Sequence, residues 1–455
     1  MRPVWRAGVH RLLLAVVLLC VMLAGCSGGG GRNADDSGSS SSDRPGAASA
    51  TASSGGSDSA ESAGRAAEGG SGGRRYQAAG TPQAAPGQLT AGEWRDVDRW
   101  DDWMELLGSR EGADNRHYWG YYRFDRLVVR AEADGQPVAD ADVYVKDADG
   151  QVIWRTKTNI DGYAYAYARM FERDYPGANM PETGSGDSRN PTRQEEGVSR
   201  AQPGYDVEVR AGGESKIFSH VPIPRGEPLV VTFEQRPKPT DAIDLMFVVD
   251  TTGSMQDEID FLREELKDVI TRARRGAGQL DIEVSVNFYR DRYDDYVIKS
   301  NPFTADIDKA VSLIAAERAE GGGDYPEAVE QALTNAVSGH EWRRSTRTRL
   351  LFLVGDAPPH REPYILEELH ETTREAAKLG IRIVPVASSG VDVNTEYLMR
   401  FLAAATGGTY VFLTDHSGIG NDHLEPAVGE FEVRPLNDLL VEIIRRCAGL
   451  PPENG

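Results

Sequence analysis

The C-terminal half of the chain alternates between short apolar runs and longer segments with helical spacing. Three mainly apolar runs, 245–249, 350–354 and 381–387, have the composition of strands that are buried on both faces. Between them, apolar residues recur every three or four positions, which predicts amphipathic helices. The helical faces are expected within 259–270, 307–314, 328–337 and 364–379, with further helices before and after a strand at 409–413. This alternation predicts an α/β domain over 240–449, built on a doubly wound, largely parallel sheet.

The middle of the chain has a period of two instead. Apolar residues alternate in short segments that are separated by Asp-Gly turns, as at Asp134-Gly135 and Asp149-Gly150. Short strands with such turns are typical of an antiparallel β-sandwich, which we expect over 125–237. The polar stretch from about Glu172 to Pro203 interrupts the pattern and is expected to form an exposed loop. The strands are expected near 127–131, 138–145, 152–154, 163–167, 205–210, 216–220 and 229–233.

A short segment rich in tryptophan, 89–124, precedes the sandwich. Trp100, Trp103 and Leu107 fall at i, i+3 and i+7, which predicts one apolar face of a helix over 96–107. The aromatic cluster at 118–122 adds further apolar surface. A platform that stacks on carbohydrate is one interpretation, and a helix packed on the next domain is the favoured one.

The N-terminus has the layout of a secretory signal. Three arginines precede an apolar stretch, 12–23, that is too short for a relaxed transmembrane span. The following Leu23-Ala24-Gly25-Cys26 resembles the lipobox of bacterial lipoproteins. The resemblance implies that residues 1–25 are removed and that Cys26 carries lipid, which would anchor the chain to the cell membrane or outer membrane, facing the periplasm or the exterior. An ordinary secretory signal with an incidental cysteine is the alternative.

Composition extends this picture. Residues 27–88 contain no Leu, Ile, Val, Phe or Met, so 26–88 is expected to be a disordered tether. A flexible chain of roughly 60 residues has a root-mean-square reach of about 40 Å. The net charge of −21 argues against a nucleic-acid partner. Loss of the signal and lipidation of Cys26 would leave only Cys447, which excludes a disulfide framework.

Candidate chemistry lies where two of the predicted buried strands end. Asp250, Thr252 and Ser254 follow one strand, and Asp356 follows the next buried strand of the same kind. Parallel strands end at a common edge, so both carboxylates are expected to lie close together, where a divalent cation would offset their repulsion. Oxygen donors suit Mg²⁺, Mn²⁺ or Ca²⁺. The alternative is an Asx or Ser/Thr turn that caps the following helix.

These motifs, with the glycine-rich loop Gly321–Glu327 between them, resemble the von Willebrand factor type A (VWA) family and its metal-ion-dependent adhesion site. The resemblance implies that Asp250, Thr252, Ser254 and Asp356 ligate a cation directly or through water, with Mg²⁺ expected first. In the family a threonine of the glycine-rich loop is usually a further ligand, whereas Gly323 or Asp324 stands here. Either water replaces that threonine, or Asp324 contributes its carboxylate.

Two finer resemblances accompany this one. Tyr289-Arg290-Asp291 and the sequence from Gly322 to Glu327 are similar to hemicentin-like and alpha-kinase-associated members of the family. In the middle region, Gly135-x-Pro137-Val138 and the later Thr158-Asn159-x-Asp161-Gly162 resemble carboxypeptidase-regulatory-like and transthyretin-like sandwiches. That similarity implies a β-sandwich fold but no particular activity.

The family resemblance implies a binding protein rather than an enzyme. Its members generally bind protein ligands, often with a partner carboxylate completing the shell of the metal. In residues 89–455, after the signal and the tether, no Gly-x-Ser-x-Gly, His-Glu-x-x-His or Gly-Lys phosphate motif occurs. The alternatives are a metal-dependent hydrolase of the cell envelope, with His360 as general base, and a cation-free structural domain. The acidic run 291–295 is read as a solvated loop, with a second cation site as the alternative. The partner and the oligomeric state are not encoded in any motif.

Overall fold

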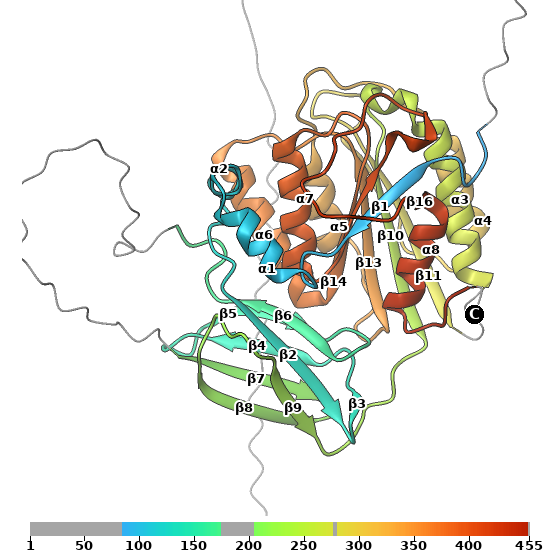
Figure 1. Cartoon of the computed structure of the whole chain (residues 1–455). Helices are drawn as coiled ribbons and strands as arrows, with labels where there is room; N and C mark the ends of the chain where they lie inside the picture. The colour runs from blue at the N-terminus through green and yellow to red at the C-terminus, as the bar shows by residue number, and fades with distance from the viewer. Residues whose placement is uncertain (1–83, 174–203, 276–279, 454–455) are drawn as a thin grey trace, which may run out of the picture. The chain divides into compact units, whose positions relative to one another are not determined.

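A computed structural model describes residues 84–173, 204–275 and 280–453 (Figure 1). The predicted signal peptide, Cys26, nearly all of the tether and nearly all of the 172–203 loop lie outside these residues. The described residues belong to one compact unit. None of the helices in this part of the chain combines the length and the apolar character that crossing a membrane requires.

An eight-stranded sheet forms the centre of the C-terminal region, in the order β12-β11-β10-β13-β14-β15-β1-β16. The five central strands pair in parallel, and β10 lies between β11 and β13. The prediction of an α/β domain with a largely parallel, doubly wound sheet is therefore confirmed. The bounds are β10 (Ala242–Asp250), β11 (Asp281–Tyr289), β12 (Ile298–Lys299), β13 (Thr348–Gly355), β14 (Ile381–Ala387), β15 (Tyr410–Leu413), β1 (Thr90–Trp94) and β16 (Arg434–Pro435).

Helices cover both faces of this sheet, and the alternation of side chains along β10 shows why. Leu245 and Phe247 pack with α3, α4 and α8 on one face, whereas Met246 and Val248 pack with α5, α6 and α7 on the other. All of these residues are buried, so the strand is apolar throughout rather than alternating. The bounds are α3 (Ile259–Arg275), α4 (Ile307–Ala316), α5 (Val329–Ser338), α6 (Pro363–Leu379), α7 (Val393–Thr406) and α8 (Leu436–Cys447).

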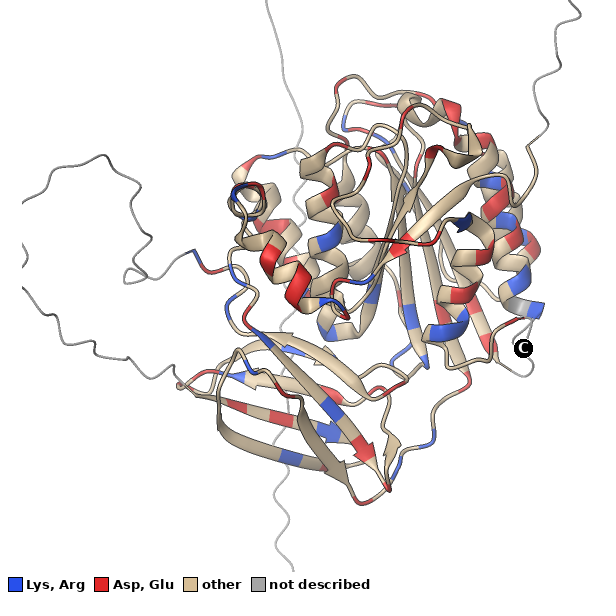
Figure 2. Ribbon diagram, viewed as in Figure 1, with Lys and Arg blue, Asp and Glu red and all other residues tan. Residues whose placement is uncertain are grey.

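The outward faces of α3 and α8 carry acidic and basic residues together (Figure 2). Arg272 on α3, for example, bonds Asp268 on its own helix at 3.1 Å and Asp438 on α8 at 2.7 Å. These are exposed ion pairs of small individual value, and they mark the solvent side of both helices.

Strand β1 was not predicted from the sequence. It pairs antiparallel with both β15 and β16, so the start of the predicted helical segment 89–124 belongs to the α/β sheet. Gly92 permits the close packing there, because a Cβ at this position would lie 2.5 Å from the Phe412 ring. The Glu265 carboxylate on α3 accepts hydrogen bonds from the backbone N–H groups of residues 87, 88 and 89, which fixes the chain just before the strand.

Two helices follow β1, namely α1 (Trp100–Gly108) and α2 (Arg110–Trp119). The Trp103 ring packs edge-on against Phe124 and Phe401, the latter on α7. Trp103 and Trp119 are almost completely buried, so they offer no stacking platform for carbohydrate. The favoured interpretation, helices packed on the neighbouring domain, describes the arrangement found.

Two four-stranded sheets lie below the α/β region in Figure 1, in the orders β3-β2-β6, with β9 beside β2, and β5-β4-β7-β8. All pairings are antiparallel except β2 with β9. Their buried residues share one core cluster with residues of α5, α6 and α7. The bounds are β2 (Arg126–Ala133), β3 (Gln136–Pro137), β4 (Asp142–Lys146), β5 (Val152–Lys157), β6 (Tyr163–Tyr167), β7 (Tyr205–Ala211), β8 (Glu214–Val221) and β9 (Leu229–Phe233).

Specific polar contacts join these sheets to the α/β region. The Tyr167 hydroxyl donates to the Ala404 carbonyl at 2.9 Å, and Arg349 donates to Asp140 at 3.0 Å. Both contacts involve side chains that are mostly buried. The two-sheet region therefore packs directly against the α/β region.

Candidate metal centre

The candidate site lies at the carboxyl ends of β10 and β13. These strands are neighbours in the sheet, and β10 has β11 on its other side, so the strand order reverses at this point. Open α/β sheets bind ligands at such a switch point, outside the carboxyl ends of the strands. Asp250 is the last residue of β10, and Asp356 directly follows β13. The sheet thus brings both predicted carboxylates to the same edge.

The Asp250 carboxylate organises the turn after β10. Its Oδ1 accepts hydrogen bonds from the Thr252 backbone N–H at 2.9 Å and from the Thr252 hydroxyl at 2.7 Å. The Thr252 Oγ1 lies 3.1 Å from the Ser254 Oγ, which is exposed. Thr252 precedes a short 3₁₀ helix (Gly253–Asp257), but its side chain does not cap that helix. The Asx turn was one of the two expected interpretations, yet it uses only one oxygen of Asp250.

Three buried carboxylates at this edge have an oxygen without a hydrogen-bond partner. The atoms are Asp250 Oδ2, Asp356 Oδ1 and Glu327 Oε2, and the three residues are at most 3% exposed. Within the described part of the chain, none of the three forms an ion pair with Lys, Arg or His. Buried polar atoms are normally satisfied, so these oxygens require a ligand or a proton.

The electrostatic cost appears in the pKa values of these groups. Burial raises the pKa of Asp250, and burial followed by the charge of Asp250 raises the pKa of Asp356. Burial, followed by the charges of Asp250, Asp291 and Asp356, raises the pKa of Glu327 to about 9. A cation at this edge would reverse these shifts, because it favours the ionised form of each carboxyl.

Tyr289, the last residue of β11, contributes its hydroxyl to the same edge. Burial and the charges of Asp250, Asp356 and Glu327 raise the pKa of this phenol well above its ordinary value. Its hydrogen bond to Asp250 lowers the pKa of that carboxyl. Tyr289 therefore acts as a neutral donor among carboxylates. Tyr289 belongs to the motif Tyr289-Arg290-Asp291, but nothing in the sequence indicates this role.

The glycine-rich loop approaches the Asp250 turn through its backbone. The Gly253 N–H donates to the Gly321 carbonyl at 3.1 Å, and the Glu320 N–H donates to the Thr251 carbonyl at 3.0 Å. Gly321 has a φ of +83°, and a Cβ there would lie 2.4 Å from Asp294. Only glycine tolerates both conditions, so this loop can close over the turn.

Comparison with known proteins agrees with this geometry. The family model described as "von Willebrand factor A domain" matches residues 244–415, which include both strand ends and the glycine-rich loop.

Residues 244–415 form a von Willebrand factor A domain.

Two curated relatives are similar to the chain over part of its length. The alpha-protein kinase vwkA of Dictyostelium discoideum is 26% identical over 178 residues, which cover 38% of this chain and 27% of the relative. The putative ariadne-like RING finger protein R811 of Acanthamoeba polyphaga mimivirus is 31% identical over 123 residues, covering 26% of this chain and 11% of the relative. The chain thus matches only a minor part of either relative.

A solved structure is also similar to the chain. The conserved hypothetical protein BatB from Bacteroides thetaiotaomicron has a TM-score of 0.32 and 12% sequence identity. The match covers 46% of this chain and 99% of that one.

Within the VWA domain, the predicted ligands do not all meet. Asp324 is exposed, and no hydrogen bond or ion pair in the described residues joins it to Asp250 or Asp356. Glu327, three residues later, is buried instead and lies beside the Gly322 backbone. Its N–H donates to the Pro358 carbonyl at 2.9 Å, in the loop that follows Asp356. Sequence reasoning missed Glu327, because its burial depends on this contact between distant segments.

The donor set of the VWA domain determines how a metal could be held. In the described ranges, no group of three or more His, Cys, Asp or Glu side chains is arranged to hold a metal on its own. Asp250 and Asp356 would therefore need the hydroxyl oxygens of Thr252, which is bonded to Asp250, and of Ser254, which lies beside Thr252. Carboxylate and hydroxyl oxygens of this kind suit a hard divalent cation. The unpartnered carboxylate oxygens fit the group that the family implies.

His360 and the acidic run 291–295 pair with neighbours rather than with Asp356. The His360 Nε2 lies 2.7 Å from Asp291 Oδ1. Asp294 accepts hydrogen bonds from the backbone N–H groups of Asp291, at 3.0 Å, and of Gly322, at 2.8 Å. These contacts fasten the loops that surround the site. No observation assigns His360 a proton-transfer role.

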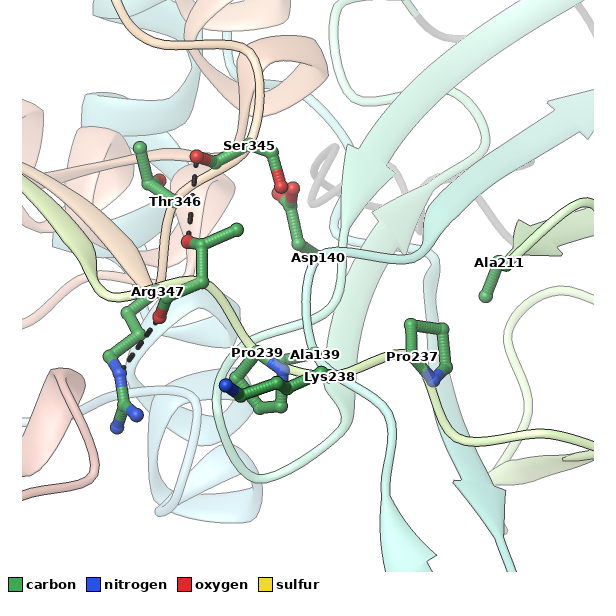
Figure 3. A pocket seen from close by; sticks show the side chains of 11 residues that line it. Ala139, Asp140, Ala211, Pro237, Lys238, Pro239, Ser345, Thr346 and Arg347 are labelled. Atoms are coloured by element: carbon green, nitrogen blue, oxygen red, sulfur yellow. Dashed lines mark hydrogen bonds between the residues drawn. The ribbon is translucent and has the colours of Figure 1, made fainter.

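A cavity of about 170 Å³ lies at the opposite end of the sheet (Figure 3). It is lined by residues that precede β10 and β13, among them Thr240, Ser345 and Arg347. The Arg347 Nε donates to the Thr240 carbonyl at 3.0 Å, so this guanidinium is engaged in joining the two segments. The cavity is separate from the carboxyl-edge site.

Proposed function

We propose that this protein binds a protein partner through a divalent cation held at the carboxyl edge of the VWA domain. The observation that carries the proposal is the set of unpartnered buried oxygens on Asp250, Asp356 and Glu327. Three buried acids with no cation from the chain itself are costly unless an external cation or protons compensate them. The position at the switch point of the sheet supports a ligand site there.

The ligands of the cation would be Asp250, Thr252, Ser254 and Asp356. Glu327 is the fifth candidate, in place of Asp324, which was expected there. We propose Mg²⁺ as the resident cation, with Mn²⁺ and Ca²⁺ as alternatives, since all three prefer oxygen ligands. When bound, the cation would supply positive charge and an open position for a partner oxygen, and a partner carboxylate would complete its shell. The Tyr289 hydroxyl would hold Asp250 in orientation through its hydrogen bond.

We propose a binding role rather than catalysis. The His360 Nε2 is hydrogen-bonded to Asp291, and no hydrogen bond within the described residues joins His360 to Asp356. A metal-dependent hydrolase remains the second candidate from sequence, but no contact in the described residues favours it over binding.

The N-terminal region completes the proposal. The lipobox-like Leu23–Cys26 supports lipidation of Cys26, and the 26–88 segment would then tether the folded part to the cell membrane or outer membrane. In cells that modify lipoproteins, labelled palmitate should be incorporated into the wild-type chain and not into Cys26→Ala. Equal incorporation would remove the lipid anchor from the proposal.

A capture experiment tests the central proposal. The full-length protein, immobilised and exposed to an envelope extract, should retain a partner in Mg²⁺ and release it when EDTA is added. Asp250→Ala should retain none, whereas Met104→Ala, which changes an exposed side chain on α1, should behave like the wild type. Capture that is indifferent to EDTA and to Asp250→Ala would contradict cation-dependent binding.

A further inference from the structure

The segments around the candidate site carry exposed tyrosines. Tyr293 is 94% exposed, Tyr364 is 60% exposed and Tyr325 is 42% exposed. Among the described residues, these three tyrosines are the exposed ones. All three belong to loops or helix starts beside the carboxyl edge. Tyrosine and arginine are enriched in the energetically dominant parts of protein interfaces. We name these three side chains the tyrosine rim.

Contacts of the Tyr325 hydroxyl connect the rim to the site. The Tyr325 hydroxyl lies 3.4 Å from the carbonyl oxygen of Asp356, a candidate ligand. It also donates to the Gly390 carbonyl at 3.0 Å and accepts from the Asp392 N–H at 2.9 Å. The ring is therefore held in place before any partner arrives, which reduces the entropy lost on binding.

Tyr293 and Tyr364 flank a second connection. Arg292 donates two hydrogen bonds to the Glu362 carboxylate, both at 2.9 Å, and so ties the loop after β11 to the start of α6. Tyr293 directly follows Arg292, and Tyr364 directly follows the first residue of α6. The nearby His360–Asp291 contact, at 2.7 Å, joins the same two loops. The rim thus rests on segments that are fastened to one another.

The net negative charge of the segments around the site favours a basic partner. The stretches 290–296, 320–327 and 356–364 together hold eight acidic and three basic residues, so a doubly charged cation would still leave the edge acidic. Arg292 is engaged by Glu362, and Arg290 donates to the Arg318 carbonyl at 3.0 Å. Asp295 and Asp324 are exposed and form no ion pair within the described part of the chain.

We infer that this edge takes a basic protein segment, in which one Asp or Glu reaches the cation and flanking Arg or Lys side chains lie against the tyrosine rim. The inference rests on the proposed function and specifies its partner. Acidic side chains such as Asp295 and Asp324 would pair with the flanking cations, and tyrosine faces attract guanidinium and ammonium groups. A segment with acidic flanks would instead meet like charge on every side of the site.

Selection from a displayed library of random peptides tests the inference. The immobilised full-length protein would be loaded in Mg²⁺, and bound peptides would be eluted with EDTA. The enriched peptides should contain Asp or Glu together with an excess of Arg and Lys at the flanking positions. If EDTA elutes enriched peptides with no such excess, the inference is overturned and cation-dependent binding stands. If EDTA elutes no enriched peptide, the proposed function itself fails.

Rim variants then test the contact surface. Tyr293→Ala and Tyr364→Ala should each weaken the binding of an enriched peptide by about tenfold, a typical loss for an interfacial tyrosine, while Mg²⁺ affinity stays that of the wild type. Met104→Ala and Val152→Ala, which remove exposed apolar side chains elsewhere, should leave peptide binding unchanged. Wild-type peptide affinity in both tyrosine variants would show that the rim is not the contact surface.

Discussion

Strand β10 begins and ends near a buried aspartate, and the two aspartates differ in one respect. Asp244 and Asp250 are both 0% exposed. The Asp244 carboxylate accepts hydrogen bonds from the Arg343 backbone N–H at 2.9 Å and from the Arg343 Nε at 2.5 Å. The Arg343 guanidinium is therefore the cation that compensates Asp244. The Asp250 carboxylate accepts hydrogen bonds only from neutral groups, those of Thr252 and Tyr289, and its Oδ2 has no hydrogen-bond partner. One end of the strand has a cation from the chain itself, and, within the described residues, the other does not.

The position in the sheet explains why the two ends differ. At the amino end, Arg343 precedes β13 and pairs with Asp244, and Arg349, the second residue of β13, pairs with Asp140. At the carboxyl end, Asp356 and Glu327 are further buried acids: burial and the charge of Asp250 raise the pKa of each of them. A structural ion pair holds the first region together. The second region keeps a place for a cation from solution, in keeping with the function proposed for it.

Removing the cation of the first region should have the largest effect. Arg343→Ala leaves Asp244 buried without its guanidinium, so we expect the free energy of unfolding to fall by about 3–5 kcal/mol. Urea denaturation at neutral pH measures this. Arg344→Ala, at an exposed neighbouring position, should change stability by less than about 0.5 kcal/mol. Equal, small losses in both variants would mean that Asp244 does not need its partner.

The incomplete region should make stability depend on pH when chelator is present. Glu327 has a folded-state pKa of about 9, well above its ordinary value, so the folded protein holds a proton there that the unfolded chain has lost. The free energy of unfolding should therefore fall as pH rises towards 9, with a slope of up to about 1.4 kcal/mol per pH unit from this one group. Urea midpoints between pH 6 and about 9 measure the slope.

Two controls sharpen that experiment. Glu327→Gln carries no titrating group, so its slope above neutral pH should be flatter than that of the wild type. Saturating Mg²⁺ should also flatten the slope, because the cation favours the ionised carboxylate. A wild-type slope in Glu327→Gln would assign the pH dependence to other groups.

Metal affinity should distinguish Glu327 from Asp324. Glu327 is buried with an unpartnered oxygen, whereas Asp324 is exposed and, within the described residues, forms no hydrogen bond or ion pair with Asp250 or Asp356. Glu327→Gln should lower Mg²⁺ affinity by about tenfold, and Asp324→Asn should leave it within about twofold of the wild type. Calorimetric titration of both variants measures this. The reverse order would restore Asp324 as the ligand.

Much of the fold could be predicted from the sequence, because periodicity reports burial. The run Leu245–Val249 reads as a buried strand, and it occupies the centre of the sheet as expected. Strand β1 could not be predicted, since Thr90–Trp94 has no alternation and is held by β15, β16 and Glu265. Helix α2 is similarly polar, and its local signals are its caps: the Ser109 side chain accepts from the Gly112 N–H, and Gly120 ends the helix in the left-handed conformation.

The candidate site was predictable only in part. Asp250 and Asp356 follow apolar strands, and the sheet brings their residues to one edge. Asp244 and Asp250 flank the same apolar run, so no local pattern separates the paired acid from the unpaired one. The difference depends on Arg343, which is 99 residues from Asp244 in the chain. Glu327 escaped notice for the same reason, because its hydrogen bond to Pro358 and its interaction with the charge of Asp250 involve distant segments.

The smallest expected effect has opposite signs at the two aspartates. In chelator, Asp250→Asn removes an uncompensated buried charge, so it should raise the free energy of unfolding by about 1 kcal/mol. Asp244→Asn removes the charge that Arg343 requires, and it should lower the free energy of unfolding by about 1–3 kcal/mol. Urea denaturation of both proteins in EDTA measures the pair. Destabilisation of equal size in both would remove the distinction between the regions.

The central claim is that Asp250, and not Asp244, binds a divalent cation. Calorimetric titration of Mg²⁺ into the wild type, Asp250→Asn and Asp244→Asn tests it most directly, because both substitutions preserve side-chain shape. The account predicts that Asp244→Asn, once shown to be folded, binds Mg²⁺ like the wild type, and that Asp250→Asn loses about a hundredfold in affinity or more. Wild-type Mg²⁺ affinity in Asp250→Asn would contradict it.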